Sequence, residues 1–177
     1  MSGDPPLTGR RPRQPGGRRV ASPRVVLVAI GAVVVVASGV LAIVLLGRVP
    51  RGVPVTSPSP DPAVAAQCRE LVAALPGRLG GARRRDTDPA TGLTAAWGEA
   101  PVVLACGVGR PAALQPTSIL TEVDGVAWLA EPLTAGVVFT TVGRAAYVEL
   151  TVPATAGPAG DLLVELAPTI RATVPPA

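Results

Sequence analysis

Histidine and lysine are absent from this 177-residue chain, which has only two cysteines and four aromatic side chains. Without histidine, the Ser–His and Cys–His pairs of nucleophilic catalysis are excluded. Two cysteines alone supply too few ligands for a zinc site. We therefore expect no metal site, no cofactor and no catalytic residue. The scarcity of aromatics predicts a core made mainly of Val, Leu, Ile and Ala.

Positive charge is concentrated at one end of the chain. Residues 1–24 carry six Arg against one acid, a net charge of +5, whereas residues 47–177 carry ten Arg against eleven acids, a net charge of −1. A basic protein that binds nucleic acid would spread its charge over the folded part. We expect no nucleic-acid partner.

The longest apolar run extends over residues 25–46 and contains no charged side chain. A helix of that length spans about 33 Å, which is enough to cross the hydrocarbon core of a bilayer. Arg residues are more numerous before the run than directly after it, and the positive-inside rule then places the N-terminus in the cytoplasm. We expect a single-pass protein of the cell membrane with its C-terminal domain outside the cytoplasm.

This topology predicts four segments. Residues 1–24 form a disordered Arg-rich cytoplasmic tail, and residues 25–46 form the transmembrane helix. Residues 47–61 form a Pro/Ser-rich linker, which we expect to be extended because proline fixes φ and removes N–H donors. Residues 62–177 form one extracytoplasmic domain, a length that suits a single core.

Two helices are predicted in this domain. The first starts with Asp61 as N-cap and Pro62 in the first turn, and its apolar residues recur at helical spacing as far as Leu75. The second starts near Pro158, and we expect Pro168 to kink or split it.

Between the helices, apolar runs separated by turn residues predict about six short strands. Asp124 and Gly125 are typical of a tight hairpin turn, and Gly143 with Arg144 predicts a second hairpin. The polar, Gly-rich residues 78–92 predict a long exposed loop. The expected fold is α+β, an antiparallel sheet with the N-terminal and C-terminal helices packed on one face, preceded by the transmembrane helix.

Three sequence runs resemble one known family. They are AAWGEAPVVLACGVGRP (Ala95–Pro111), EVDGVAWL (Glu122–Leu129) and FTTVGRAAYVELTVP (Phe139–Pro153). Their order and spacing are similar to those of DUF3515, a family of unknown function from the actinobacterial envelope. The resemblance covers about residues 68–174 and implies a membrane-attached envelope protein without an assigned activity. The chain departs from the pattern at Ala105, where an Arg is common, and at residues 99–101.

Cys68 lies on the apolar face of the first predicted helix and Cys106 at the end of a predicted strand. In a domain outside the cytoplasm this placement predicts a structural disulfide. The bond would stabilise the fold by about 4 kcal/mol in the chain-entropy model. A redox pair or a metal site is the alternative, but the spacing is not C-x-x-C and other ligands are missing.

Four residues are candidates for contact with a ligand or partner. Arg110 and Arg144 each follow a glycine in a predicted turn and together would suit an anion. Trp97 would suit a sugar or peptide groove, and Glu99 is the acid that local turn chemistry explains least. The competing interpretation makes both Arg solvated, Trp97 part of the core and Glu99 an exposed turn residue.

These patterns favour a non-catalytic, membrane-tethered domain that binds a protein or cell-wall partner at the envelope, with the bilayer itself as a further partner. The first alternative is an envelope enzyme that uses carboxylates for acid/base chemistry, with Glu99 as the residue to test. The second is a structural subunit of an envelope complex.

Overall fold

The computed structural model describes residues 52–177, which belong to one compact unit, Pro50–Ala177. The predicted tail of residues 1–24 and the predicted span of residues 25–46 lie outside the described residues. Within residues 52–177, no helix is long and apolar enough to cross a membrane.

The described part is α+β, with two helices and ten strands. In chain order the elements are β1 (Val53–Pro54), α2 (Pro62–Ala74), β2 (Arg78–Leu79), β3 (Ala82–Arg85), β4 (Thr87–Asp88), β5 (Thr94–Trp97), β6 (Val102–Val108), β7 (Thr121–Val123), β8 (Val126–Leu133), β9 (Gly136–Val142), β10 (Tyr147–Pro153) and α3 (Ala159–Thr173).

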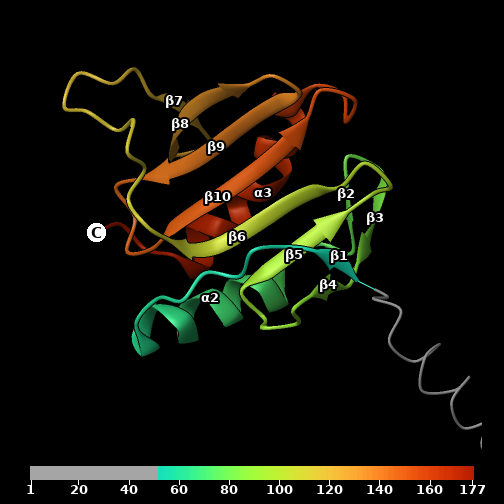
Figure 1. Ribbon diagram of the computed structural model, residues 1–177. Helices are drawn as coiled ribbons and strands as arrows, with labels where there is room; N and C mark the ends of the chain where they lie inside the picture. The colour runs from blue at the N-terminus through green and yellow to red at the C-terminus, as the bar shows by residue number, and fades with distance from the viewer. Residues whose placement is uncertain (1–51) are drawn as a thin grey trace, which may run out of the picture. The chain divides into compact units, whose positions relative to one another are not determined.

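Eight strands form one antiparallel sheet in the order β2-β3-β5-β6-β10-β9-β8-β7. The long strands β6, β10, β9 and β8 are its centre, and the ribbon shows α3 behind them and α2 below β6 (Figure 1). β1 and β4 pair in parallel as a separate two-stranded sheet. The antiparallel sheet and the two helices confirm the expected fold class, although the sheet has more strands than the six predicted.

Both helices start close to the predicted positions. Asp61 is the N-cap of α2, and its carboxylate accepts the backbone N–H groups of Ala63 and Val64 at 3.1 Å each. These bonds satisfy two of the donors that a helix start leaves unpaired. α3 begins after Pro158 and continues through Pro168 as one element, so Pro168 does not split the helix, although splitting was one of the two predicted outcomes.

The core lies between the helices and one face of the sheet. Side chains alternate along β10, with Val148, Leu150 and Val152 buried toward the helices while Tyr147 and Glu149 are half-buried on the opposite face. We call this second face of the sheet the outer face. It is only partly open, because Ala96 and Ala105, which point to it, are buried.

The prediction of an exposed loop over residues 78–92 holds for residues 89–92 and is wrong for residues 78–88, which contain three short strands. β2 and β3 form a hairpin there, with Gly80 and Gly81 at positive φ in the turn, and Leu79 is buried in the core. Arg84, on β3, donates to the backbone carbonyls of Val72 at 2.8 Å and Leu75 at 3.2 Å. Arg84 therefore caps the last turn of α2, although its charge contributed to the prediction of a loop.

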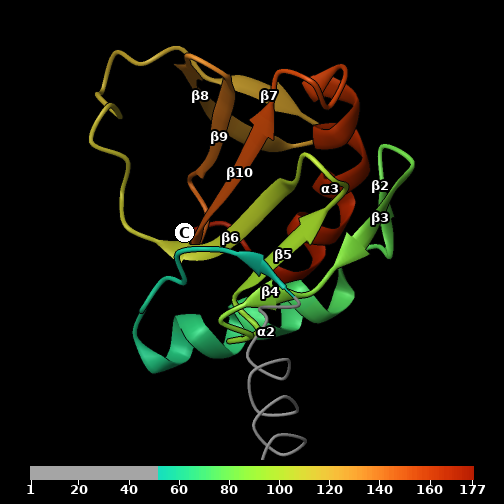
Figure 2. The same cartoon turned by 45° about the vertical axis from the view of Figure 1, so that its right-hand side comes forward.

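Part of the predicted linker packs against the domain. Residues 53–61 run from β1 to the start of α2, alongside the strands (Figure 2), and we call them the strap. The backbone N–H groups of Val53 and Val55 donate to the carbonyls of Asp86 and Asp88 at 2.8 and 3.0 Å. The strap is therefore held by hydrogen bonds at its N-terminal end and by the helix at its other end.

Glycine permits a close contact between the strap and the sheet. Gly107 has a φ of 85°, and a Cβ at this position would lie 2.6 Å from Cγ of Pro60. Any larger residue would push the strap away from β6 and would also strain the backbone. Gly107 thus allows Pro60 to lie directly against the end of β6.

Candidate functional site

The disulfide joins the first helix to the sheet. Cys68 of α2 and Cys106 of β6 are bonded, with their Cα atoms 5.4 Å apart, and both side chains are fully buried. The predicted pairing is confirmed. The bond ties α2 to the central strand that also forms the floor of the site described below.

Trp97 lies inside the core. Its side chain has 0% exposed surface, and its Nε1–H donates to the carbonyl of Pro76 at 3.0 Å. The guanidinium of Arg84 lies 5.9 Å from the centre of its ring. The indole offers no free surface to a ligand and instead packs the end of β5 against the helix terminus.

Arg144 is buried and binds its own chain. It is only 9% exposed, and its two terminal nitrogens donate to the carbonyls of Val174 at 2.8 Å and Gly125 at 2.6 Å. The side chain therefore links the β7–β8 turn to the segment that follows α3. Charge-assisted bonds of this kind position the loops that they connect.

Arg110 and Glu99 have different surroundings. Arg110 donates to the carbonyl of Leu114 at 2.7 Å within the long loop between β6 and β7. Glu99 is fully exposed, and its nearest cation is Arg85, with 3.9 Å between the oxygen and nitrogen atoms. Such an exposed pair contributes little to stability.

The structure does not bring the four predicted contact residues together. Trp97 and Glu99 lie before the start of β6, whereas Arg110 lies beyond its end, with the seven residues of Val102–Val108 between them. At about 3.3 Å per residue, this strand separates the two groups by roughly 20 Å. Arg144 precedes β10, whose start is paired with the end of β6, and lies at the same end as Arg110.

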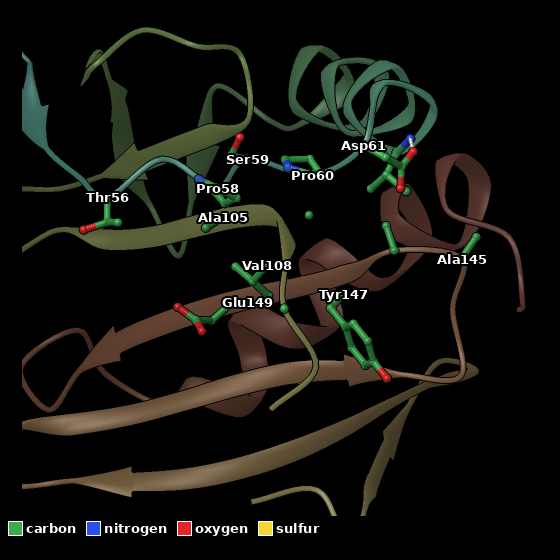
Figure 3. A pocket seen from close by; sticks show the side chains of 14 residues that line it. Thr56, Pro58, Ser59, Pro60, Asp61, Ala105, Val108, Ala145, Tyr147 and Glu149 are labelled. Carbon is green, nitrogen blue, oxygen red and sulfur yellow. Dashed lines mark hydrogen bonds between the residues drawn. The ribbon is translucent and has the colours of Figure 1, made fainter. Parts of the chain in front are cut away.

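A cavity of about 630 Å³ lies where the strap crosses the outer face at the end of β6 and the start of β10 (Figure 3). We call it the strap pocket. Its walls come from three parts of the chain, the strap with the first turn of α2, the end of β6, and the start of β10. The lining residues are Thr56, Pro58, Ser59, Pro60, Asp61, Val64, Ala105, Gly107, Val108, Gly109, Ala145, Ala146, Tyr147 and Glu149.

Glu149 is the carboxylate on the floor of the strap pocket. It lies on β10 beside Ala105 of β6, its partner in the strand register. Within residues 52–177, no hydrogen bond or ion pair reaches its carboxylate. Burial, followed by repulsion from Glu131, raises the pKa of the Glu149 carboxyl above its ordinary value. A perturbed acid in a cavity is a common mark of a functional site.

The residues around Glu149 offer a mixed surface. Thr56, Ser59 and Tyr147 supply hydroxyl groups, while the remaining walls are mainly proline, valine and alanine. The close-up shows Tyr147 and Glu149 projecting from the same strand, with Pro58 and Ser59 of the strap on the other side of the cavity (Figure 3). Polar groups set in apolar walls are what small-ligand sites generally present.

A metal centre is not formed in the part of the chain that the structure describes. No three His, Cys, Asp or Glu side chains within residues 52–177 gather closely enough to hold a metal ion.

Sequence reasoning did not select Glu149 as a site residue. The available signal was a single acid inside an otherwise uncharged strand, Tyr147–Pro153. The strap that encloses it starts more than eighty residues earlier in the chain, so no local pattern could reveal the cavity.

The comparisons agree with the family resemblance. The family model described as "Protein of unknown function (DUF3515)" matches residues 26–177, and the chain belongs to this family. No curated protein and no solved structure matches the chain significantly.

Proposed function

We propose that this chain is a membrane-tethered, non-catalytic envelope protein whose outer domain binds a protein or cell-wall partner through the strap pocket. The apolar residues 25–46 and the Arg-rich residues before them support the membrane tether. The Cys68–Cys106 disulfide supports a location outside the cytoplasm, because such bonds persist in oxidising compartments.

The observation that carries this proposal is the unpartnered Glu149 carboxylate in a cavity of about 630 Å³. A half-buried acid without a partner costs stability, because burial disfavours its charged form. A purely structural strand would tolerate a neutral residue at this position at least as well. A binding role accounts for both the acid and the space beside it.

The test is photo-crosslinking in native membranes. A photoreactive amino acid is placed at Thr56, in the strap pocket, in the full-length chain. The matched control carries the same amino acid at Val164, which is 51% exposed on α3, a helix on the opposite side of the sheet. Adducts from position 56 and not from position 164 support the proposal.

The same experiment addresses the alternatives. Adducts of similar yield from both positions would favour a structural subunit surrounded by other envelope proteins. No adduct from position 56 would contradict binding in the strap pocket.

The carboxylate-enzyme alternative now rests on Glu149 instead of Glu99. Glu99 is fully exposed, whereas Glu149 has a raised pKa inside a cavity, which is what a general acid requires. Loss of a turnover activity in Glu149→Gln, but not in Glu99→Gln, would support this alternative.

A further inference from the structure

The strap pocket is lined by acidic side chains and by no basic side chain. Among its lining residues the acids are Asp61 and Glu149, and no Arg lines it. The two Arg residues nearest to it in sequence, Arg110 and Arg144, donate to backbone carbonyls of their own chain. Both guanidinium groups are directed at these carbonyls, so the only ionisable groups with a formal charge on the walls of the cavity itself are the two carboxylates, which favour a cationic ligand over an anionic one.

The positive end of α2 does not reverse this preference. The first turn of α2 borders the cavity, and a free helix start attracts anions through its unpaired N–H groups. Here Asp61 Oδ1 accepts the N–H groups of Ala63 and Val64. The cap occupies these donors and adds a negative charge beside them.

Glu149 has room for a partner in front of it. Its neighbour on β6 in the strand register is Ala105, whose side chain is a single methyl group. A long cationic side chain at position 105 would lie across the strand pair from Glu149 and neutralise it. With alanine there, this chain supplies no such cation, and the space remains part of the cavity.

We propose that the strap pocket binds a primary ammonium group carried on a short aliphatic stem, with Glu149 as its counter-ion. This inference rests on the proposed function, because it names the chemistry of the ligand for the same site. Thr56, Ser59 and Tyr147 supply hydroxyl groups on separate parts of the cavity wall, where they can bind polar groups of the ligand beyond the ammonium (Figure 3). Pro58, Pro60 and Val108 provide apolar contacts for the stem.

Two sources carry this chemistry, a lysine side chain of a partner protein and an amino group of a cell-wall peptide. They are separated by digesting the adduct from position 56. An adduct in which mass spectrometry of the tryptic digest finds a peptide of a second protein joined to position 56 has a protein source, and one that shortens with a wall-degrading muramidase has a wall source.

The ligand class is tested with Nα-acetyl-lysine methylamide as the probe. Its binding to the full-length chain in lipid nanodiscs is measured by ligand-observed NMR titration. The neutral control probe is the same compound acetylated on its side-chain nitrogen, which keeps the stem and removes the charge. We expect the ammonium probe to bind and the neutral probe to bind about 10-fold more weakly or worse.

Three variants examine the role of Glu149. Glu149→Gln keeps the shape and removes the charge, so the Kd of the ammonium probe should rise about 10-fold or more. Ala105→Arg places an internal cation opposite Glu149 and should weaken binding in the same way. Glu122→Gln removes the same charge from exposed β7, outside the pocket, and should leave the Kd unchanged. Thermal unfolding of each variant establishes that it is folded.

An equal Kd for the wild type and folded Glu149→Gln would overturn the inference. Equal binding of the two probes, or no detectable binding of the ammonium probe to the wild type, would overturn it as well. If crosslinks from position 56 persist in any of these cases, the pocket binds another kind of ligand and only the ammonium assignment fails. If those crosslinks are absent too, the proposed function fails with it.

Discussion

Trp128 is a fully buried side chain of the β7–β8 hairpin, on the face of the sheet that packs against the helices. Its Nε1–H is buried without a hydrogen-bond partner within the described part of the chain. An unpaired donor of this kind costs about 1–3 kcal/mol. The large apolar area of the ring outweighs this cost, so the side chain acts as core despite its polar atom.

Trp128→Ala should therefore destabilise the domain by about 3 kcal/mol or more, because it removes a large buried ring and leaves a cavity. Trp128→Phe is the matched comparison. It keeps an aromatic ring and removes the unpaired N–H, so this variant should lose clearly less stability than Trp128→Ala. Chemical denaturation followed by circular dichroism measures both. A Trp128→Ala variant that unfolds at the denaturant concentration of the parent would indicate that this ring is exposed in solution.

Glu149 illustrates the conflict between binding and stability at the scale of one residue. Its pKa is raised in the folded protein by burial and by Glu131. At pH values between the ordinary pKa of Glu and the raised one, the folded state binds more protons than the unfolded state. Stability therefore falls as the pH rises through this window, and the ionised carboxylate destabilises the fold above it.

Glu149→Gln should raise the Tm at pH 7 by about 2 °C, a modest gain because solvent screens a half-buried charge. The gain should vanish near pH 3, where Glu149 is protonated in both states. Glu122→Gln on exposed β7 should leave the Tm unchanged at both pH values. Fluorescence of the buried tryptophans during heating measures the effect. A lower Tm for Glu149→Gln at pH 7 would mean that the carboxylate makes a stabilising contact.

At the scale of elements, the proline-rich strap is part of the folded domain as well as a spacer. Prolines in this region predicted an extended spacer, and the strap is extended, but it also pairs with β4 and covers part of the outer face. Val53, inside this segment, is buried. The strap therefore contributes to the core, caps α2 through Asp61 and walls the pocket.

Removing the strap should weaken the domain. A fragment of residues 62–177 loses the burial of Val53 and the N-cap Asp61, which are worth about 1.5–3 and about 1 kcal/mol. We expect its free energy of unfolding to be at least about 2 kcal/mol below that of a fragment of residues 52–177. Urea denaturation of the two fragments measures the difference. Equal midpoints would show that the strap does not contribute to the fold.

The hydrogen bonds that hold separate elements together also depend on how those elements pack. Arg144 was predicted from its turn to be solvated or bound to an anion, but it reaches the carbonyls of Val174 and Gly125. Its acceptors lie 30 and 19 residues away, so the turn sequence alone contained no sign of them.

At the scale of the whole molecule, the topology stays a prediction, because residues 25–46 lie outside the described part. We expect protease added to intact spheroplasts to digest the chain after residue 47 and to spare residues 1–24, because the Arg excess keeps the tail inside. Antibodies against each end follow the digestion. Permeabilised spheroplasts are the control, in which both ends should be lost. Loss of the tail alone from intact spheroplasts would show that the orientation is opposite to the predicted one.

Local rules in the sequence were sufficient for several elements. Asp61 and Pro62 determined the start of α2, because an N-cap and an N1 proline act within one turn. Asp124 and Gly125 determined the β7–β8 turn, where both residues have positive φ. The two cysteines had each other as sole partners, so their pairing also followed from the sequence.

Only the tertiary structure decided which polar residues are free and which are used internally. Arg110 and Arg144 bind backbone carbonyls, Trp97 bonds to Pro76, and Glu149 is left without a partner among the described residues. The physical reason is that burial and pairing depend on segments distant in sequence. Periodicity reports the face on which a side chain lies, but the strap that turns this face of β10 into a cavity comes from the opposite end of the domain.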